Sequence, residues 1–410
     1  MRGVNPPAAA PDPEPSASTP TDRPAEGPSD DGLALVMSGG GARGAYQVGF
    51  LRAVAEQVPS FDPPILTGVS AGAINAAFLG SHAGTFATRV GQLEQLWRDL
   101  RADDVMDAST LKVWQIALGF GLRLLSGGLI TTKERRSLLD TSPLRAFLCR
   151  VLDAPDGRLP GVARNIESGR LRALALTASS YTDGGTVTFC EGRDVELWRR
   201  PLRRSRKVDL TVDHVMASSA LPFFFPAVKL DEGTRDAAWY GDGGIRLTAP
   251  LAPAVHLGAT RILAISTRSN EELPKGGHPV EEAIPYPPPS QIGSALMNAM
   301  FLDQFDGDAL RMERVNRLVA KIPPDDRGDL REIGLKVFRP SQDLGAMANE
   351  YEARLPKNLR FLTRGTGTLE TRNNDFLSLI MFQTDYVSRL VELGHADALQ
   401  QSDEIAAFLG

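Results

Sequence analysis

The pattern of apolar and polar residues changes at Leu33, where a polar, proline-rich stretch gives way to short apolar runs. Residues 33–37 (LALVM) and 65–69 (ILTGV) are nearly continuous apolar runs, the pattern of a strand covered on both faces. Residues 45–56 and 71–81 follow them with apolar side chains about one helical turn apart. This alternation of strand and helix predicts a parallel sheet with right-handed crossovers.

The same strand pattern returns later in the chain, at residues 171–180, 186–190 and 259–266. Helical spacing then dominates at residues 294–320 and 374–400, with a strand-like segment between them at residues 335–341. We therefore expect four parts, which are a disordered Pro/Ala-rich leader at 1–31, a catalytic domain at 32–268, a proline-rich loop at 269–292 and a mainly helical region at 293–410.

The composition is that of an ordinary soluble chain of 410 residues, 42% of them hydrophobic and 23% charged. The formal net charge of −5 argues against a nucleic-acid-binding protein, whose surface is usually basic. Cys149 and Cys190 are the only cysteines, so we expect neither a disulfide framework nor a cysteine-based zinc site. Residues 1–31 lack the apolar core of a signal peptide, and residues 111–130 hold too many charges and glycines to span a membrane. We expect a cytoplasmic protein.

Three consecutive glycines interrupt the apolar pattern in VMSGGGARGAYQVGFL, residues 36–51. The segment Gly39–Gly44 matches G-x-G-x-x-G, which is typical of a dinucleotide site with phosphate at a helix N-terminus. However, the second expected strand is not followed by the acidic residue that would bind a ribose, and the Lys-Ser/Thr pair of a P-loop is absent. The alternative is a row of backbone amides that stabilise a developing oxyanion.

A second glycine-containing turn, Gly68–Gly72 (GVSAG), matches G-x-S-x-G between an expected strand and an expected helix. A serine on such a turn has strained dihedrals, and its hydroxyl projects alone from the end of the sheet. The flanking glycines let strand and helix approach, and the partial positive charge of the helix N-terminus favours an anion. Ser70 is therefore a candidate nucleophile, and the alternative is an ordinary strand–helix turn.

A serine nucleophile needs a base, and the residues present two kinds of candidate. The first kind is histidine, and the chain has His82, His214, His256, His278 and His395. None of these histidines lies in a glycine-rich turn or in another motif. Asp242 instead follows the strand-like pair Trp239–Tyr240 and is flanked by Gly241, Gly243 and Gly244. This indicates a carboxylate aimed into a tight site, although Asp-Gly turns are also common in loops.

Taken in order, Gly39–Gly44, Gly68–Gly72 and Asp242–Gly244 resemble the motifs of the patatin-like phospholipase family. The resemblance runs from about Leu33 to Ser266 and includes ASSALPFFFPAV and APLAPAVHLGA. It implies an α/β fold, a three-layer α/β/α sandwich with a mainly parallel central sheet, followed here by a mainly helical C-terminal extension. The family uses a Ser–Asp dyad without a histidine.

Carried over residue by residue, the resemblance implies that Ser70 is the nucleophile and Asp242 the base. It implies an oxyanion hole made by Gly39, Gly40 and Gly41 with Arg43 beside it. The supporting motif glycines are Gly44, Gly68, Gly72, Gly243 and Gly244. Where the family often has Asn-x-Pro after the Asp-Gly motif, this chain has Thr248-Ala249-Pro250, a difference that concerns a supporting hydrogen bond rather than the dyad.

The expected activity is hydrolysis of acyl esters of lipids, of the phospholipase A or lysophospholipase type, without a metal or organic cofactor. The alternatives are a dinucleotide-binding protein and an inactive scaffold of the same fold. The expected partner is a lipid, and two segments are candidates for peripheral contact with a membrane. They are residues 111–130 and a basic stretch of Arg199, Arg200, Arg203, Arg204, Arg206 and Lys207. The alternatives for these segments are a core or active-site wall and a solvated loop.

Overall fold

The computed structural model describes residues 32–107, 139–222, 224–231, 237–269, 304–354 and 375–410, together with Ile292 and Ala295. Residues 31–410 form one compact unit. The expected leader at residues 1–31, the apolar stretch at 111–130 and most of the loop at 269–292 lie outside the described residues.

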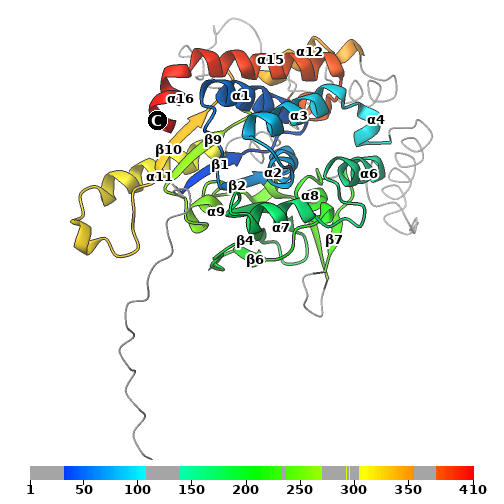
Figure 1. The fold of residues 1–410 in the computed structure, drawn as a ribbon. Coiled ribbons are helices and arrows are strands. Elements are labelled where there is room, and N and C mark those ends of the chain that lie inside the picture. Colours follow the sequence, from blue (N-terminus) through cyan, green and yellow to red (C-terminus); the bar gives the residue numbers. More distant parts are fainter. Residues whose placement is uncertain are drawn as a thin grey trace, which may run out of the picture. The chain divides into compact units, whose positions relative to one another are not determined.

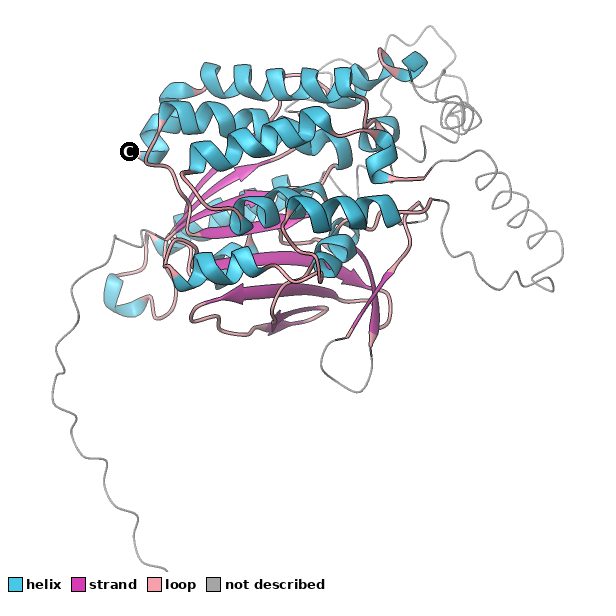
Figure 2. Ribbon diagram, turned by 45° about the vertical axis from the view of Figure 1, so that its right-hand side comes forward, coloured by secondary structure: helices cyan, strands magenta, loops and turns pink. Residues whose placement is uncertain are grey.

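A mainly parallel sheet lies between layers of helices (Figure 1; Figure 2). Its parallel part contains, in spatial order, β10 (Gly334–Phe338), β9 (Arg261–Ile265), β1 (Leu33–Met37), β2 (Ile65–Val69) and β3 (Ala173–Ser180). Antiparallel strands extend the sheet beyond β3, namely β4 (Thr186–Gly192), β6 (Arg203–Lys207) and β5 (Arg199–Arg200), with β6 parallel to β4. The hairpin of β7 (Val228–Leu230) and β8 (Ala238–Asp242) pairs with the end of β3.

Successive residues of each central strand point to opposite faces, and each face has its own apolar core. In β1, Leu35 and Met37 belong to one core, whereas Ala34 and Val36 belong to the other. The larger core is covered by α1 (Gly44–Gln57), α2 (Ala71–Ser81), α3 (Phe86–Asp99), α6 (Ser142–Val151), α7 (Pro160–Glu167) and α8 (Val212–Ser218). The smaller is covered by α9 (Ala252–His256) and α11 (Gln304–Val319). The predicted α/β/α sandwich is confirmed.

The C-terminal helix α15 (Thr384–Gln400) packs along α1 (Figure 1). Glycines bring the two backbones into contact, because a side chain at Gly49 would overlap the carbonyl oxygen of Val391, and one at Gly394 would overlap that of Tyr46. The Tyr46 hydroxyl also donates a hydrogen bond of 3.0 Å to Asp397. The apolar face of this helix is therefore part of the core, as the helical pattern indicated.

Residues 374–400, where helical spacing was expected, form two helices rather than one. Helix α14 (Asp375–Ile380) ends, residues 381–383 are not helical, and α15 then begins. The break contains no glycine or proline, so the helical periodicity gave no sign of it. The remaining described elements are α4 (Ala102–Val105), α12 (Leu344–Asn349), α16 (Ser402–Leu409) and the short 3-10 turns η1 (Gly41–Arg43), η2 (Gly243–Arg246), η3 (Pro324–Asp326) and η4 (Glu352–Arg354).

The basic stretch forms the hairpin β5–β6 at the edge of the sheet rather than an irregular loop. Among the described residues, no helix combines the length and the hydropathy needed to cross a bilayer.

Candidate active site

Ser70 and Asp242 come together because two strands approach each other along the same edge of β3. Strand β2 pairs Val69 with Thr177, and β8 pairs Asp242 with Ala178, the next residue of β3. Strand β4 occupies the other edge of β3. The carboxyl ends of β2 and β8 therefore meet head to head, and the residue that follows Val69 lies beside the end of β8.

Ser70 occupies a strained turn between β2 and α2, with φ 54° and ψ −126°. This region of conformational space is costly for a residue with a side chain, and it occurs where neighbouring structure enforces it. Here the enforcement comes from close packing, since a side chain at Gly68 would overlap the carbonyl oxygen of Gly72, and one at Gly72 would overlap that of Met37. Strand and helix can approach this closely only if both positions are glycine.

Two further serines hold the backbone of this turn. The Ser70 amide donates a hydrogen bond of 3.1 Å to the hydroxyl of Ser218, which in turn donates one of 2.6 Å to the Thr177 carbonyl. The hydroxyl of Ser219 donates to the Ser70 carbonyl at 3.0 Å. No sequence motif identifies these two serines, and the signal that could have found them is a pair of adjacent hydroxyls in the otherwise apolar segment ASSALPFFFPAV.

The carboxyl group of Asp242 is completely buried next to this turn. Its Oδ1 accepts a 2.8 Å hydrogen bond from the Gly244 amide, whereas Oδ2 has no hydrogen-bond partner within the described residues. Burial raises the pKa of Asp242 to about 7, although the nearby Ser70 hydroxyl and the Gly244 amide act to lower it. The Ser70 hydroxyl is therefore close to Asp242 without forming a hydrogen bond of ordinary geometry. A carboxylate with a pKa near neutrality is well matched to general-base chemistry.

The glycine loop lies directly against Ser70. A side-chain carbon at Gly39 would lie 3.0 Å from the Ser70 Cβ. Gly40 and Gly41 have φ values of 149° and 54°, a conformation that favours glycine. The Thr267 hydroxyl fixes the loop by donating 2.7 Å to the Gly39 carbonyl. Within the described residues, the amides of Gly39 and Gly40 donate no hydrogen bond, so they remain able to donate to a ligand.

A buried network of polar side chains holds the backbone at the two ends of the glycine loop. The Gln47 amide group donates to the Ser38 carbonyl at 2.9 Å, and the Asn75 amide group donates to Gln47 Oε1 at 3.0 Å and to the Gly44 carbonyl at 3.1 Å. The indole of Trp97 donates to Asn75 Oδ1 at 2.8 Å. Buried polar groups paired in this way fix the position of the backbone. Sequence reasoning missed this network, whose signal is an isolated polar residue on each of two apolar helices.

Arg43, expected beside the oxyanion hole, contacts the C-terminal region through its side chain. Its side chain is buried, and its Nε donates a 2.6 Å hydrogen bond to the hydroxyl of Ser378. Gly44, which follows it, brings the loop close to α2, because a side-chain carbon there would lie 2.8 Å from the Ala71 Cβ.

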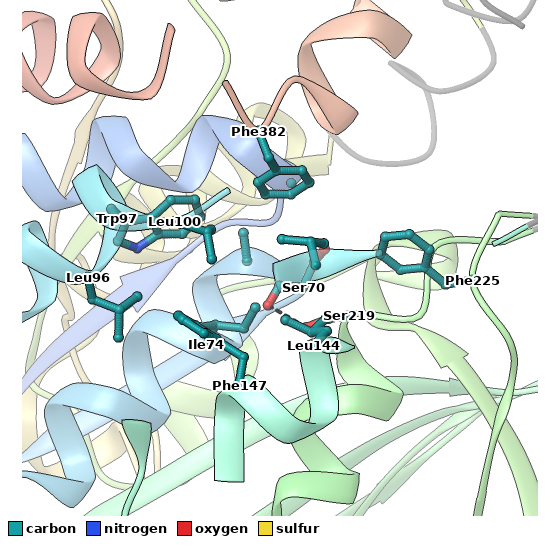
Figure 3. A pocket seen from close by; sticks show the side chains of 13 residues that line it. Ser70, Ile74, Leu96, Trp97, Leu100, Leu144, Phe147, Ser219, Phe225 and Phe382 are labelled. Atoms are coloured by element: carbon teal, nitrogen blue, oxygen red, sulfur yellow. Dashed lines mark hydrogen bonds between the residues drawn. The ribbon is translucent and has the colours of Figure 1, made fainter. Parts of the chain in front are cut away.

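An apolar cavity opens onto Ser70 (Figure 3). Its volume is about 480 Å³, including the open mouth. Ser70 and Ser219 supply the hydroxyls of its lining, and the other lining residues are Gly41, Ala71, Ile74, Leu96, Trp97, Leu100, Val105, Leu144, Phe147, Phe225 and Phe382. A concave, mostly apolar site with a few placed polar groups suits a small apolar ligand such as an acyl chain.

The described histidines are engaged elsewhere. His82 stacks on Phe78, His256 stacks on Trp198, His214 contacts the Thr211 hydroxyl and His395 contacts Glu56. Burial lowers the pKa of His214 to about 4. His278 lies outside the described residues. Among the residues that the structure describes, no group of three or more His, Cys, Asp or Glu side chains is arranged to hold a metal ion.

Comparison with known proteins finds one matching family and several similar structures. A family model described as patatin-like phospholipase matches residues 35–255. VipD from Legionella pneumophila is 11% identical with a TM-score of 0.36, and the match covers 91% of this chain and 67% of that one. Human GIVD cytosolic phospholipase A2, solved in complex with methyl gamma-linolenyl fluorophosphonate, is 12% identical with a TM-score of 0.39, and the match covers 95% of this chain but only 60% of the human one. In the ExoU–SpcU complex of Pseudomonas aeruginosa, the matching chain is 16% identical with a TM-score of 0.27, over 92% of this chain and 76% of that one. The search of curated proteins finds no match.

Proposed function

Because this chain belongs to the patatin-like phospholipase family, we propose that it hydrolyses acyl esters of lipids through a Ser70–Asp242 dyad. The observation that carries the proposal is the meeting of β2 and β8 beside an apolar cavity. It brings a strained serine, a buried carboxylate of raised pKa and a loop with free amides into one place.

In the acylation step, the Ser70 oxygen attacks the ester carbonyl carbon and its proton passes to the Asp242 carboxylate. The carbonyl oxygen becomes an oxyanion, which the amides of the glycine loop stabilise together with the N-terminus of α2. The tetrahedral intermediate then collapses. The bond to the alcohol breaks, the alcohol takes the proton from Asp242, and the acyl group remains on Ser70.

In the second step, a water molecule replaces the alcohol. Asp242 takes a proton from the water as the hydroxide attacks the acyl carbon, and the fatty acid leaves when the Ser70 oxygen recovers that proton. The apolar lining of the cavity accommodates the acyl chain through both steps. Transfer to an acceptor other than water uses the same intermediate, and comparing the released products with added alcohols measures how much of it occurs.

The test is lipid hydrolysis by the purified protein on mixed phospholipids, lysophospholipids and neutral glycerides, with products identified by mass spectrometry. Ser70→Ala and Asp242→Asn should each abolish hydrolysis, and the double variant should lose little more, because the two groups act as a unit. The matched control is His256→Ala, which removes a histidine stacked on Trp198 and should retain most activity. Full activity in Ser70→Ala would refute the proposal.

We also propose that the hairpin β5–β6 contacts anionic membrane surfaces. Its register places the Pro201–Leu202 turn at the same end of the sheet as Ser70, because β6 is parallel to β4 and β4 is antiparallel to β3. Leu202 is 64% exposed and Arg199 and Arg200 are exposed, whereas Arg204 pairs with Asp183. An apolar residue beside exposed arginines is the composition of an interfacial contact.

Sedimentation with neutral and anionic vesicles tests the contact. Arg199→Glu/Arg200→Glu should weaken binding to anionic vesicles by at least about thirtyfold, since each basic residue contributes about 1 kcal/mol near such a surface and each added glutamate is repelled by it. Added salt should also weaken binding. The control is Arg314→Glu/Arg317→Glu on α11, which reverses two exposed arginines elsewhere. Equal binding by the two reversed proteins would exclude the hairpin.

A further inference from the structure

A segment far outside the family-matched residues 35–255 contacts the glycine loop and the cavity. It consists of residues 377–382, from the second half of α14 to the break before α15, and is called here the C-terminal wall. Three separate contacts join it to the site that surrounds Ser70. The sequence motifs include no residue of this segment.

The first contact is between backbones. Gly41 has a φ of 54°, and a side chain at this position would overlap the carbonyl oxygen of Leu379. The glycine loop and the C-terminal wall are therefore in direct contact at a residue that also lines the cavity. Glycine at this position serves the packing of α14 as well as the backbone conformation of the loop.

The second contact pairs a buried charge with a buried hydroxyl. Arg43 lies at the end of the glycine loop, it is 2% exposed, and its Nε donates to Ser378, which is completely buried. A buried guanidinium requires hydrogen-bond acceptors, because an unpaired charge in the interior is very costly. The acceptor at Ser378 thus ties the orientation of the Arg43 side chain, and the loop from which it projects, to α14.

The third contact is with the cavity itself. Phe382 lines the same cavity as Ser70 and lies above it, opposite Phe147 and Leu144 (Figure 3). Its position depends on the break between α14 and α15, where the Phe382 amide donates to the Ile380 carbonyl at 2.9 Å. The Phe382 ring is 8% exposed, and the volume that it occupies is not available to a bound acyl chain.

We infer that the C-terminal wall is part of the active site, with Ser378 positioning the glycine loop through Arg43 and Phe382 limiting the acyl chain that the cavity accepts. This inference rests on the proposed function. It assigns a substrate-selecting side chain and a positioning residue to the part of the chain beyond the family match.

The first experiment measures kcat and KM on a water-soluble short-chain ester for Ser378→Ala and Ser378→Thr. Loss of the hydroxyl should lower kcat by between about tenfold and about a hundredfold with little change in KM, because the loop amides act in the transition state and small displacements are costly there. Threonine keeps the hydroxyl and should restore most of kcat. The control is Ser341→Ala, which removes a hydroxyl hydrogen bond to Asp397 on α15 and does not line the cavity.

The second experiment measures kcat/KM along a series of nitrophenyl esters of increasing acyl length for Phe382→Ala. The ratio between long and short chains should rise by about tenfold, the scale on which an apolar pocket discriminates chain length. The control is Phe408→Ala on α16, a partly buried phenylalanine that does not line the cavity. Circular dichroism and thermal unfolding show that each variant is folded before its kinetics are compared.

Ser70→Ala in the same assays distinguishes a failure of the proposed function from a failure of the inference about the C-terminal wall. If Ser70→Ala abolishes turnover while Ser378→Ala and Phe382→Ala match their controls, the C-terminal wall has no catalytic role and the inference is overturned. If Ser378→Thr is as impaired as Ser378→Ala, the hydroxyl is not the positioning group and the assignment of Ser378 is wrong. If Ser70→Ala itself retains turnover, the proposed function has failed.

Discussion

Replacing Asp242 by asparagine should increase the stability of the protein at neutral pH while it abolishes activity. Burial is the main reason that the pKa of Asp242 rises to about 7. An aspartate in an unfolded chain has a pKa of about 3.9. A carboxyl group whose pKa is raised on folding contributes stability below its unfolded pKa, and it loses that contribution as the pH rises through its folded pKa. The ionised Asp242 carboxylate therefore destabilises the folded protein, and an uncharged asparagine side chain does not have this effect.

The magnitude follows from the two pKa values. A separation of about three pKa units corresponds to about 4 kcal/mol when the carboxyl is fully ionised. At pH 5 the cost is between about 1 and about 2 kcal/mol and at pH 8 about 4 kcal/mol, so the difference between variant and wild type should grow by between about 2 and about 3 kcal/mol over this range. Asparagine also places an amide where Oδ2 lacks a partner among the described residues, and that buried donor costs about 1–3 kcal/mol at every pH.

The pH dependence of the difference, rather than its absolute size, therefore tests the reasoning. Urea unfolding of the wild type and of Asp242→Asn at pH 5, 6, 7 and 8 gives the difference in unfolding free energy at each pH. Other titrating groups are common to both proteins and cancel. The difference should rise up to about pH 7 and then level off. A difference that stays constant from pH 5 to 8 would show that the folded protein leaves the Asp242 pKa where the unfolded chain has it.

Three further outcomes are expected. kcat/KM should rise tenfold per pH unit up to about pH 7 and then level, because Asp242 must be ionised to act as base, and a pH-independent profile from pH 5 to 8 would contradict this role. Ser218→Ala should lower kcat and cost about 1–3 kcal/mol in urea unfolding, since it leaves two buried backbone groups without their partner. Ser81→Ala, which removes a buried hydroxyl that has no partner among the described residues, is its control, and equal effects would exclude a specific role. Gly394→Ala should cost about 3 kcal/mol or more because the added carbon overlaps α1, whereas Gly91→Ala, with open space around it, should be neutral or stabilising, and equal unfolding midpoints would refute the close packing.

Much of the fold was predictable because the core is strictly patterned. Residues 33–37 and 65–69 are strands with the predicted bounds, and residues 71–81 form the predicted helix. These segments are covered on all sides, so their local apolar pattern and their final environment agree. The turn at Ser70 was predictable for a related reason, since only glycines at 68 and 72 permit the observed contact between strand and helix.

The rest depends on contacts between residues distant in sequence. The break at residues 381–383 has no glycine or proline, and it coincides with the position at which Phe382 lines the cavity. Ser218 and Asn75 are polar residues in apolar surroundings, and their partners are revealed only by the fold. The guanidinium of Arg43 donates a hydrogen bond to Ser378, which lies 335 residues away, and no local pattern connects the two residues.

The packing of α15 on α1 has a consequence for the order in which the protein is made. When residue 269 has left the ribosome, the chain already holds Ser70, Asp242 and the glycine loop, but neither β10 nor α15 has been synthesised. At about 5–20 residues per second, the next hundred or so residues take about 5–20 s. During that interval, α15 has not yet covered the surface of α1 around Gly49 that it contacts in the finished protein. The emerging protein therefore exposes this face of α1 for several seconds. This is the period in which binding of a chaperone would prevent aggregation most effectively.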